Sequence, residues 1–238
     1  MKDTLLKLRI RRILWAQGYH CPLEVDLSHF EYEQMGRTLK RSPITDIDVL
    51  GIYFEPDLRF KTIVVDCKSG NVSEPNRLFW IRGLMDFFGA QEGILVKSRL
   101  HAHAKSLAPR LSIRLLDDNG LAALEKAIDV DKLGINLMDI NIHKKSQELW
   151  GIKFPKSHKP TESELTLKSA YQYLQYLYWM IEEYRNIQTI MDRFSAIRES
   201  LDYSQLKSKY LVNIGLQRLA LSILKMASEV ADLSLIHI

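Results

Sequence analysis

The sequence is poor in cysteine, in long apolar runs and in net charge. Its 238 residues include only two cysteines, Cys21 and Cys67, so a disulfide framework is excluded and we expect a reducing, cytoplasmic location. The most hydrophobic stretch beyond the N-terminal region, residues 174–181, is far too short to span a bilayer, so no membrane association is expected. The net charge of +4 permits a polyanionic partner without requiring one. Walker A and G-x-G-x-x-G patterns are also missing, which argues against nucleotide-driven chemistry.

What is present is an ordinary globular composition whose hydrophobic period changes along the chain. Apolar residues make up 46% and charged residues 26%, as in many soluble domains. Helical and strand-like periods alternate in the order α-β-β-β-α-β-α-β, over residues 5–17, 22–27, 47–52, 63–68, 73–90, 92–98, 102–111 and 112–117. A further helix follows, and the polar stretch 28–43 reads as a loop. This order predicts an α/β domain with a mixed, partly parallel sheet over residues 1–130.

The second half of the chain is expected to be helical. Residues 131–160 are irregular in pattern and are interpreted as a connection. Thr161 and Glu164 form a capping box, from which one long helix is predicted to run to Phe194. A second helix is predicted over residues 204–230.

Both predicted helices carry an apolar stripe that needs a partner surface. Four candidates for this surface remain open: the other helix, the first domain, a second copy of the chain, or the part of the natural chain expected beyond Asp232. We therefore expect the helical region 161–232 to form a homodimer, to bind a partner, or to recognise DNA. The last six residues, Leu233–Ile238, resemble a translated sequencing adaptor. We expect this tail to be non-native and the natural chain to continue beyond Asp232.

Two strand-like runs carry charged residues where buried strands are usually apolar. Asp48 lies within the first run, and Asp66 and Lys68 end the second. Because side chains alternate along a strand, Asp66 and Lys68 share one face. If the two runs pair through the turn at residues 55–60, Asp48 and Asp66 converge beside Lys68. Carboxylate oxygens are the ligands that Mg²⁺ prefers, so the sequence predicts a divalent-metal site at the strand ends.

The order of these motifs resembles the PD-(D/E)xK nuclease superfamily. D-x-D-V-L-G (46–51) stands on one strand and V-V-D-C-K (64–68) on the next, between a preceding helix and a following helix and strand. The resemblance extends over residues 1–120 and is to the core of Mrr-like restriction and repair nucleases. It implies a restriction endonuclease-like αβββαβ core with a mixed sheet. It also implies that the protein binds DNA and hydrolyses its phosphodiester bonds with Mg²⁺ or Mn²⁺, in restriction, defence or repair.

The resemblance also implies roles for individual residues. By position in the motif, Asp48 and Asp66 would bind the metal, together with the backbone carbonyl of Cys67. Lys68 would be the catalytic lysine. Asp48 and Asp66 would also be catalytic residues, through the metal that they bind. Such a metal ion can polarise a phosphodiester and generate hydroxide at neutral pH.

Two further acids are additional candidates for the metal site. Asp46 is the weaker choice for the first-strand acid. In such motifs the acid directly before V-L-G, here Asp48, is more often the catalytic one. Many members of the superfamily carry an acid on the first helix, where this chain has only Asp3, and Glu24 could take that place. No proline directly precedes Asp46 or Asp48, and the Q-x-x-x-Y motif is missing after Lys68, so the subfamily stays open.

Other readings of the same residues remain open. The fold could be catalytically inactive and act as a nucleic-acid-binding or scaffold module through its helices. Alternatively, Asp46 and Asp48 could lie on the edge of a β-hairpin, with residues 66–68 as a solvated strand end and without any site. In both cases the helical region would carry the function.

Two smaller groups of residues are candidates outside the motif. Lys97, Arg99 and Lys105 cluster after the fourth predicted strand, where they could contact phosphate or simply be solvated. His101 and His103 are two residues apart, but the sequence offers no further zinc ligand at an evident spacing. They are therefore expected to be surface histidines at the start of a helix.

Overall fold

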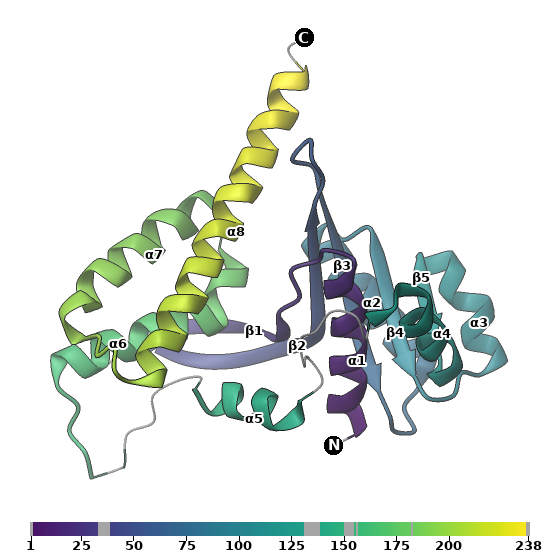
Figure 1. The fold of residues 1–238 in the computed structure, drawn as a ribbon, viewed down its shortest axis with the longest axis horizontal. Helices are drawn as coiled ribbons and strands as arrows, with labels where there is room; N and C mark the ends of the chain where they lie inside the picture. The colour runs from purple at the N-terminus through teal and green to yellow at the C-terminus, as the bar shows by residue number, and fades with distance from the viewer. Residues whose placement is uncertain are drawn as a thin grey trace. The chain divides into compact units, whose positions relative to one another are not determined.

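The chain forms two structural units, and each is described by itself. The computed structural model describes residues 2–32, 39–130, 139–149, 155, 157–181 and 183–236 (Figure 1). The first unit comprises Met1–Val25 and Asp46–Ile140, and the second comprises Asp26–Thr45 and Asn141–Ile238. The segment Asp26–Thr45 therefore belongs with the helical part of the chain, although its position in the sequence placed it in the first predicted domain.

The first unit is an α/β fold, as predicted. Its elements are α1 (Lys2–Ala16), β3 (Phe60–Lys68), α2 (Glu74–Phe88), β4 (Glu92–Lys97), α3 (Ala102–Leu107), β5 (Ile113–Leu116) and α4 (Asp118–Ile128), together with the start of β1 (Leu23–Tyr32) and the end of β2 (Leu39–Phe54), whose other residues fall in the second unit. The strands form one five-stranded sheet in the order β1-β2-β3-β4-β5. The strands β2 and β3 are antiparallel, whereas β3, β4 and β5 are parallel, so the sheet is mixed.

Two faces of the sheet are covered by different helices. Apolar residues of α1 and α4 pack with alternate residues of β2, β3 and β4, including Val49, Val65 and Cys67. The helix α2 packs on the other face of β3 and β4. There Gly93 lets the helix approach closely, because an added Cβ would lie 2.6 Å from Ile81. Since alternate residues of a strand point to opposite faces, Asp66 and Lys68 point toward α2.

Several element ends carry residues that local rules favour there. Gly18 follows α1 with φ +90°, a conformation that favours glycine. The turn between β2 and β3 is closed by the Leu58 N–H, which donates to the Glu55 carbonyl at 2.9 Å. Ser73 is the N-cap of α2 in an extended conformation, although its side chain makes no capping hydrogen bond. The helix α3 gives way to a 3₁₀ turn, Ala108–Leu111, at Pro109.

The prediction of a loop over residues 28–43 is wrong for the part of this stretch that the structure describes. The strand β1 continues to Tyr32, and β2 already begins at Leu39. Polar side chains in this stretch are satisfied across the strands: Arg41 donates to Ser28 Oγ at 2.9 Å and pairs with Asp26. The polar composition of this stretch favoured a loop in the prediction. In the structure the polar side chains pair with one another across the strands, so the stretch can form strands.

The second unit contains helices, but the long helix predicted from Thr161 to Phe194 is interrupted. The helix α6 (Glu162–Gln172) continues as a π-helical turn (Tyr173–Leu177) and a 3₁₀ turn (Tyr178–Met180), and α7 spans Glu183–Ile197. Ile181 between them is extended. Asn186 stabilises this break, because its amide donates to the carbonyls of Tyr178 and Ile181, both at 3.1 Å.

The other helical predictions have mixed outcomes. The capping box of Thr161 and Glu164 is confirmed. The second long helix is confirmed as α8 (Leu206–Ile236), which includes the first residues of the tail expected to be non-native. The predicted connection 131–160 contains a helix, α5 (Ile140–Leu149), so it is not irregular throughout. Among the described residues, no helix combines the length and apolar character that a membrane span requires.

Candidate functional site

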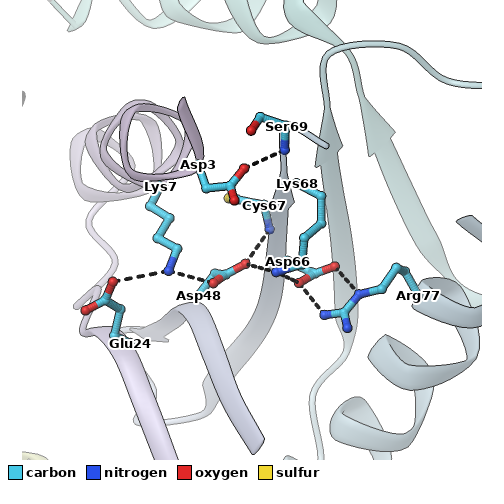
Figure 2. A network of polar contacts seen from close by, with 9 residues as sticks. All are labelled: Asp3, Lys7, Glu24, Asp48, Asp66, Cys67, Lys68, Ser69 and Arg77. Carbon is cyan, nitrogen blue, oxygen red and sulfur yellow. Dashed lines mark hydrogen bonds and ion pairs between the residues drawn. The ribbon is translucent and has the colours of Figure 1, made fainter. Parts of the chain in front are cut away.

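The carboxylates of Asp48, inside β2, and of Asp66, near the end of β3, converge. The ladder between β2 and β3 pairs Val49 with Val65, and the next position along each strand is occupied by Asp48 and Asp66. Both side chains are almost fully buried, with exposed fractions of 3% and 0%. Figure 2 shows them facing one another between α1, β3 and α2. The sequence-based expectation that these two acids meet is therefore realised in the structure.

Lys68 lies against both carboxylates. Its Nζ is 3.2 Å from Asp48 Oδ2 and 3.1 Å from Asp66 Oδ1 (Figure 2). The lysine remains partly accessible, with a side-chain exposure of 25%. A positive charge is thus held between two buried carboxylates, and solvent can reach it.

The backbone of Cys67 contributes to the same cluster. Its N–H donates to Asp48 Oδ2 at 2.7 Å, which fixes the orientation of that carboxylate. The Cys67 side chain points to the other face of the sheet, into the core beneath α1. Burial raises the pKa of the Cys67 thiol well above its usual value, so the thiol is not a nucleophile at neutral pH. The role of its carbonyl as a metal ligand stays a prediction.

Lys7 of α1 is a second cation at Asp48. Its Nζ lies 2.8 Å from Asp48 Oδ1 and 3.2 Å from Glu24 Oε1 (Figure 2). Glu24 adopts φ +52°, which is uncommon for a residue with a side chain and indicates a locally constrained backbone. Glu24 therefore joins the cluster through Lys7 and not through direct contact with either aspartate.

Arg77 of α2 is the third cation and binds Asp66. Its Nε donates to Asp66 Oδ2 at 2.7 Å and its Nη2 to Oδ1 at 2.5 Å, a bidentate pair. The guanidinium also stacks on the ring of Trp80, 4.0 Å from the ring centroid. The position of Arg77 is therefore fixed from two sides.

The two aspartates differ in how easily they ionise. Burial opposes the ionisation of Asp48, but the Lys7 ammonium and the Cys67 N–H outweigh it and lower the pKa of Asp48. Burial raises the pKa of Asp66 despite the nearby Arg77 and Lys68. Burial also opposes the charge on Lys68, but the two carboxylates prevail and raise its pKa. Lys68 is therefore an ammonium ion at neutral pH.

The remaining acids of the motif lie at the edge of the site or outside it. Asp3 accepts a hydrogen bond from the Ser69 N–H at 2.5 Å, directly after Lys68. Asp3 thus holds the end of β3, as Figure 2 shows, and does not contact either central aspartate. Asp46 is exposed, whereas Asp48 is buried, which favours Asp48 as the first-strand acid.

A second polar cluster surrounds Glu74 at the start of α2. Lys97 Nζ lies 2.7 Å from Glu74 Oε1, and His101 donates its backbone N–H to Oε2 at 3.1 Å. The ring Nδ1 of His101 is 2.9 Å from Oε1, and Nε2 of His103 is 3.9 Å from Oε2. Burial opposes the charge on Glu74, but Lys97 and His101 lower its pKa to about 2.

The three predicted phosphate contacts have different environments. Lys97 is buried, with 5% of its surface exposed, and its ammonium is held by Glu74. A buried, paired ammonium is unavailable to a phosphate at the surface, so Lys97 does not fit that role. Arg99 and Lys105 are exposed. The outcome for these two stays a prediction.

Sequence reasoning missed Lys7, Arg77 and Glu74. A weak signal exists for the last two: α2 begins six residues after Lys68, so its first turn must lie near the end of β3. Lys7 belongs to the polar face of an amphipathic helix, where a lysine is expected whether or not it has a function. Its pairing depends on how α1 packs, which the local pattern does not determine.

The donor set at Asp48 and Asp66 fits a hard divalent cation. Mg²⁺ takes oxygen ligands, retains several waters and is usually bound through one or two carboxylates. Two buried carboxylates supply those oxygens, and Lys68 already holds a positive charge between them. An ion that binds both carboxylates has to take the place of the Lys68 ammonium at one or both of them. The residues therefore fit the ion, with Lys68 as the group that must move.

Comparisons with known proteins provide no relative. No protein-family model matches the chain, and no curated protein and no solved structure is significantly similar to it. The function therefore has to be inferred from the site itself.

Proposed function

We propose that the protein is a divalent-metal-dependent nuclease of the PD-(D/E)xK type that hydrolyses phosphodiester bonds in DNA. The observation that carries this proposal is the Lys68 ammonium held between two buried carboxylates, 3.2 Å from Asp48 and 3.1 Å from Asp66. The acids and the lysine come from adjacent strands in the order that the motif requires. The order α1-β1-β2-β3-α2-β4 in the mixed sheet supports the αβββαβ core.

In this reaction Asp48 and Asp66 would hold the metal, with the Cys67 carbonyl as a third oxygen ligand. A bound Mg²⁺ or Mn²⁺ supplies Lewis acidity and lowers the pKa of a coordinated water. Because the pKa of Lys68 is raised, this lysine acts as a hydrogen-bond donor and a fixed positive charge, not as a general base. It would orient the attacking water or stabilise the charge that develops on the phosphate oxygens.

Other residues of the cluster prepare the two carboxylates. Lys7 favours the ionised form of Asp48 and thereby keeps one ligand charged. Arg77 orients Asp66 through two hydrogen bonds, and Lys68 is the second cation on that carboxylate. Arg99 and Lys105 remain candidates for contacts with DNA phosphates.

The direct test is cleavage of supercoiled, linear and single-stranded DNA by the purified chain with Mg²⁺ or Mn²⁺. We expect EDTA to abolish cleavage and Lys68→Ala to reduce it by at least about 100-fold. Lys61→Ala is the matched control, because Lys61 lies on the same strand, is 54% exposed and pairs with Glu55. Cleavage that survives unchanged in Lys68→Ala would contradict the proposed role of this residue.

A second candidate function is a catalytically inactive nuclease fold that binds nucleic acid or scaffolds an assembly. One observation favours it: Lys7 and Arg77 already neutralise the two aspartates in addition to Lys68. The same experiment separates the candidates. DNA binding by the folded protein in a mobility-shift assay, without cleavage at any tested metal concentration, would favour the inactive fold.

A further inference from the structure

Glu74, His101 and His103 bring a carboxylate and two imidazoles together outside the aspartate cluster. One ligand atom from each of the three residues lies within 4.8 Å of the others. Glu74 is the first residue of α2, His101 is the N-cap of α3, and His103 follows in the first turn of α3. The sheet therefore assembles this group from two segments 27 residues apart, which explains why the sequence spacing did not reveal it.

We propose that Glu74, His101 and His103 form a binding site for a divalent transition metal of the zinc class. Imidazole nitrogens and carboxylate oxygens are ordinary ligands of Zn²⁺, and three protein ligands leave one position for water or another group. This inference does not depend on the nuclease proposal, because it uses none of the residues of the Asp48 and Asp66 cluster.

The spacing of the ligand atoms suits such an ion. With metal–ligand distances of about 2.0 to 2.2 Å, ligand atoms in a tetrahedral site lie roughly 3.3 to 3.6 Å apart. The Glu74 Oε1 to His101 Nδ1 distance is 2.9 Å and the Glu74 Oε2 to His103 Nε2 distance is 3.9 Å. The two distances involve different oxygens of Glu74, but one ligand atom from each residue lies within 4.8 Å of the others, so rotations of the exposed imidazoles would bring three atoms to the ideal spacing.

The carboxylate is fixed and the imidazoles are accessible. The Glu74 side chain is only 1% exposed, whereas those of His101 and His103 are 61% and 60% exposed. Glu74 is oriented by the His101 backbone N–H at 3.1 Å and by Lys97 at 2.7 Å. Partners of this kind, which hold a ligand in place, usually accompany protein metal sites. The rings of His101 and His103 lie within 12° of parallel, with centroids 5.5 Å apart, and their exposure leaves an ion an approach from solvent.

Lys97 balances the charge of Glu74 without a metal. Its ammonium also lies 3.5 Å from the Val72 carbonyl, a second partner that it can retain. Metal binding therefore needs Glu74 to share its charge between Lys97 and the ion, and it need not expose Lys97. Because imidazole ligands disfavour Mg²⁺, the two clusters would select different ions.

The test is Zn²⁺ binding by the purified, chelator-treated full chain, measured by isothermal titration calorimetry. Co²⁺ absorption spectra provide a second readout, since tetrahedral coordination with nitrogen ligands has a distinctive intense band. We expect one site, and we expect His103→Ala and Glu74→Gln each to raise the dissociation constant at least about tenfold. His158→Ala is the matched control, because His158 also lies 3.0 Å from a glutamate, Glu164, outside the cluster.

The variants distinguish Zn²⁺ binding at this site from binding elsewhere on the chain. Unchanged Zn²⁺ affinity in His103→Ala would overturn the proposal, as would absent binding by the folded wild-type chain. His103 is exposed, so circular dichroism should show that this variant folds normally. Asp66→Asn should retain Zn²⁺ binding, and its loss in that variant would assign the zinc to the aspartate cluster instead. A failure of DNA cleavage alone would leave the Zn²⁺ result unaffected.

Discussion

Asp48 and Asp66 lie side by side, yet we expect their neutralisation to affect stability differently. The pKa of Asp48 is lowered in the folded protein, so its ionised form stabilises the fold above its unfolded pKa of about 3.9. The pKa of Asp66 is raised by burial, so its ionised form is less favourable in the folded state than in the unfolded chain. Asp48→Asn should therefore destabilise the protein at pH 7 more than Asp66→Asn does.

The magnitudes follow from the partners that each substitution leaves behind. The Lys7 side chain is only 12% exposed. Without the Asp48 charge, its ammonium retains the Glu24 carboxylate at 3.2 Å as its remaining ion-pair partner. Removal of one partner from a buried ion pair costs about 3 to 5 kcal/mol, and the remaining Glu24 contact reduces this to about 2 to 3 kcal/mol. In Asp66→Asn the loss of the ion pair with Arg77 is destabilising. This loss is offset because the unfavourable burial of the Asp66 charge is removed as well. We therefore expect a change within about 1 kcal/mol of wild type.

Urea denaturation at pH 7, followed by circular dichroism, measures both free energies of unfolding. Asp46→Asn is the control, since Asp46 is exposed two residues earlier on the same strand, and it should change stability by no more than about 0.5 kcal/mol. The deficit of Asp48→Asn should shrink as the pH falls below about 4, because the carboxyl of residue 48 in the unfolded wild-type chain then takes up a proton, and it should vanish below the lowered pKa of folded Asp48. Equal losses in the two variants at pH 7, or a larger loss in Asp66→Asn, would refute the reasoning.

Two further predictions concern packing and thiol chemistry. In Gly93→Ala the new Cβ would lie 2.6 Å from Ile81, so we expect a loss of about 1 to 3 kcal/mol in urea denaturation. Gly83→Ala has nothing within 4 Å and should instead stabilise α2 by about 0.5 to 1 kcal/mol, and a loss there would contradict the packing interpretation. Burial raises the pKa of Cys21 to about 12 and that of Cys67 well above normal, so both thiols should resist Ellman's reagent until the chain unfolds. Reaction of the native protein as fast as of the urea-unfolded chain would be the contrary result.

The central site was predictable because it depends on short-range rules. Alternation along a strand puts Asp66 and Lys68 on one face, and an antiparallel turn at residues 55–60 brings Asp48 opposite Asp66. Both rules act within about 20 residues of chain. The order of helices and strands in the first unit was predictable for a similar reason, since each element has its own hydrophobic period.

The features that could not be predicted from the sequence depend on tertiary contacts. Arg41 is satisfied only when β1 and β2 pair, so the same residues looked like a loop. The break at Ile181 depends on Asn186, whose amide binds carbonyls of the preceding turns, while the hydrophobic stripe runs on without interruption. Glu74 meets His101 because α2 and α3 start at the same end of the sheet. No local pattern carries that information.

The matching of charges around the two aspartates has a consequence for the order of binding. Asp48, Asp66 and Glu24 face the cations Lys7, Lys68 and Arg77, and Asp3 at the edge adds a fourth carboxylate, so the cluster has no excess of positive charge (Figure 2). Such a cluster exerts little long-range attraction on a phosphate. A divalent ion would add two positive charges at that point and turn it into an anion receptor. Under the proposed function, metal and DNA would then bind cooperatively, each raising the affinity of the site for the other by the same factor.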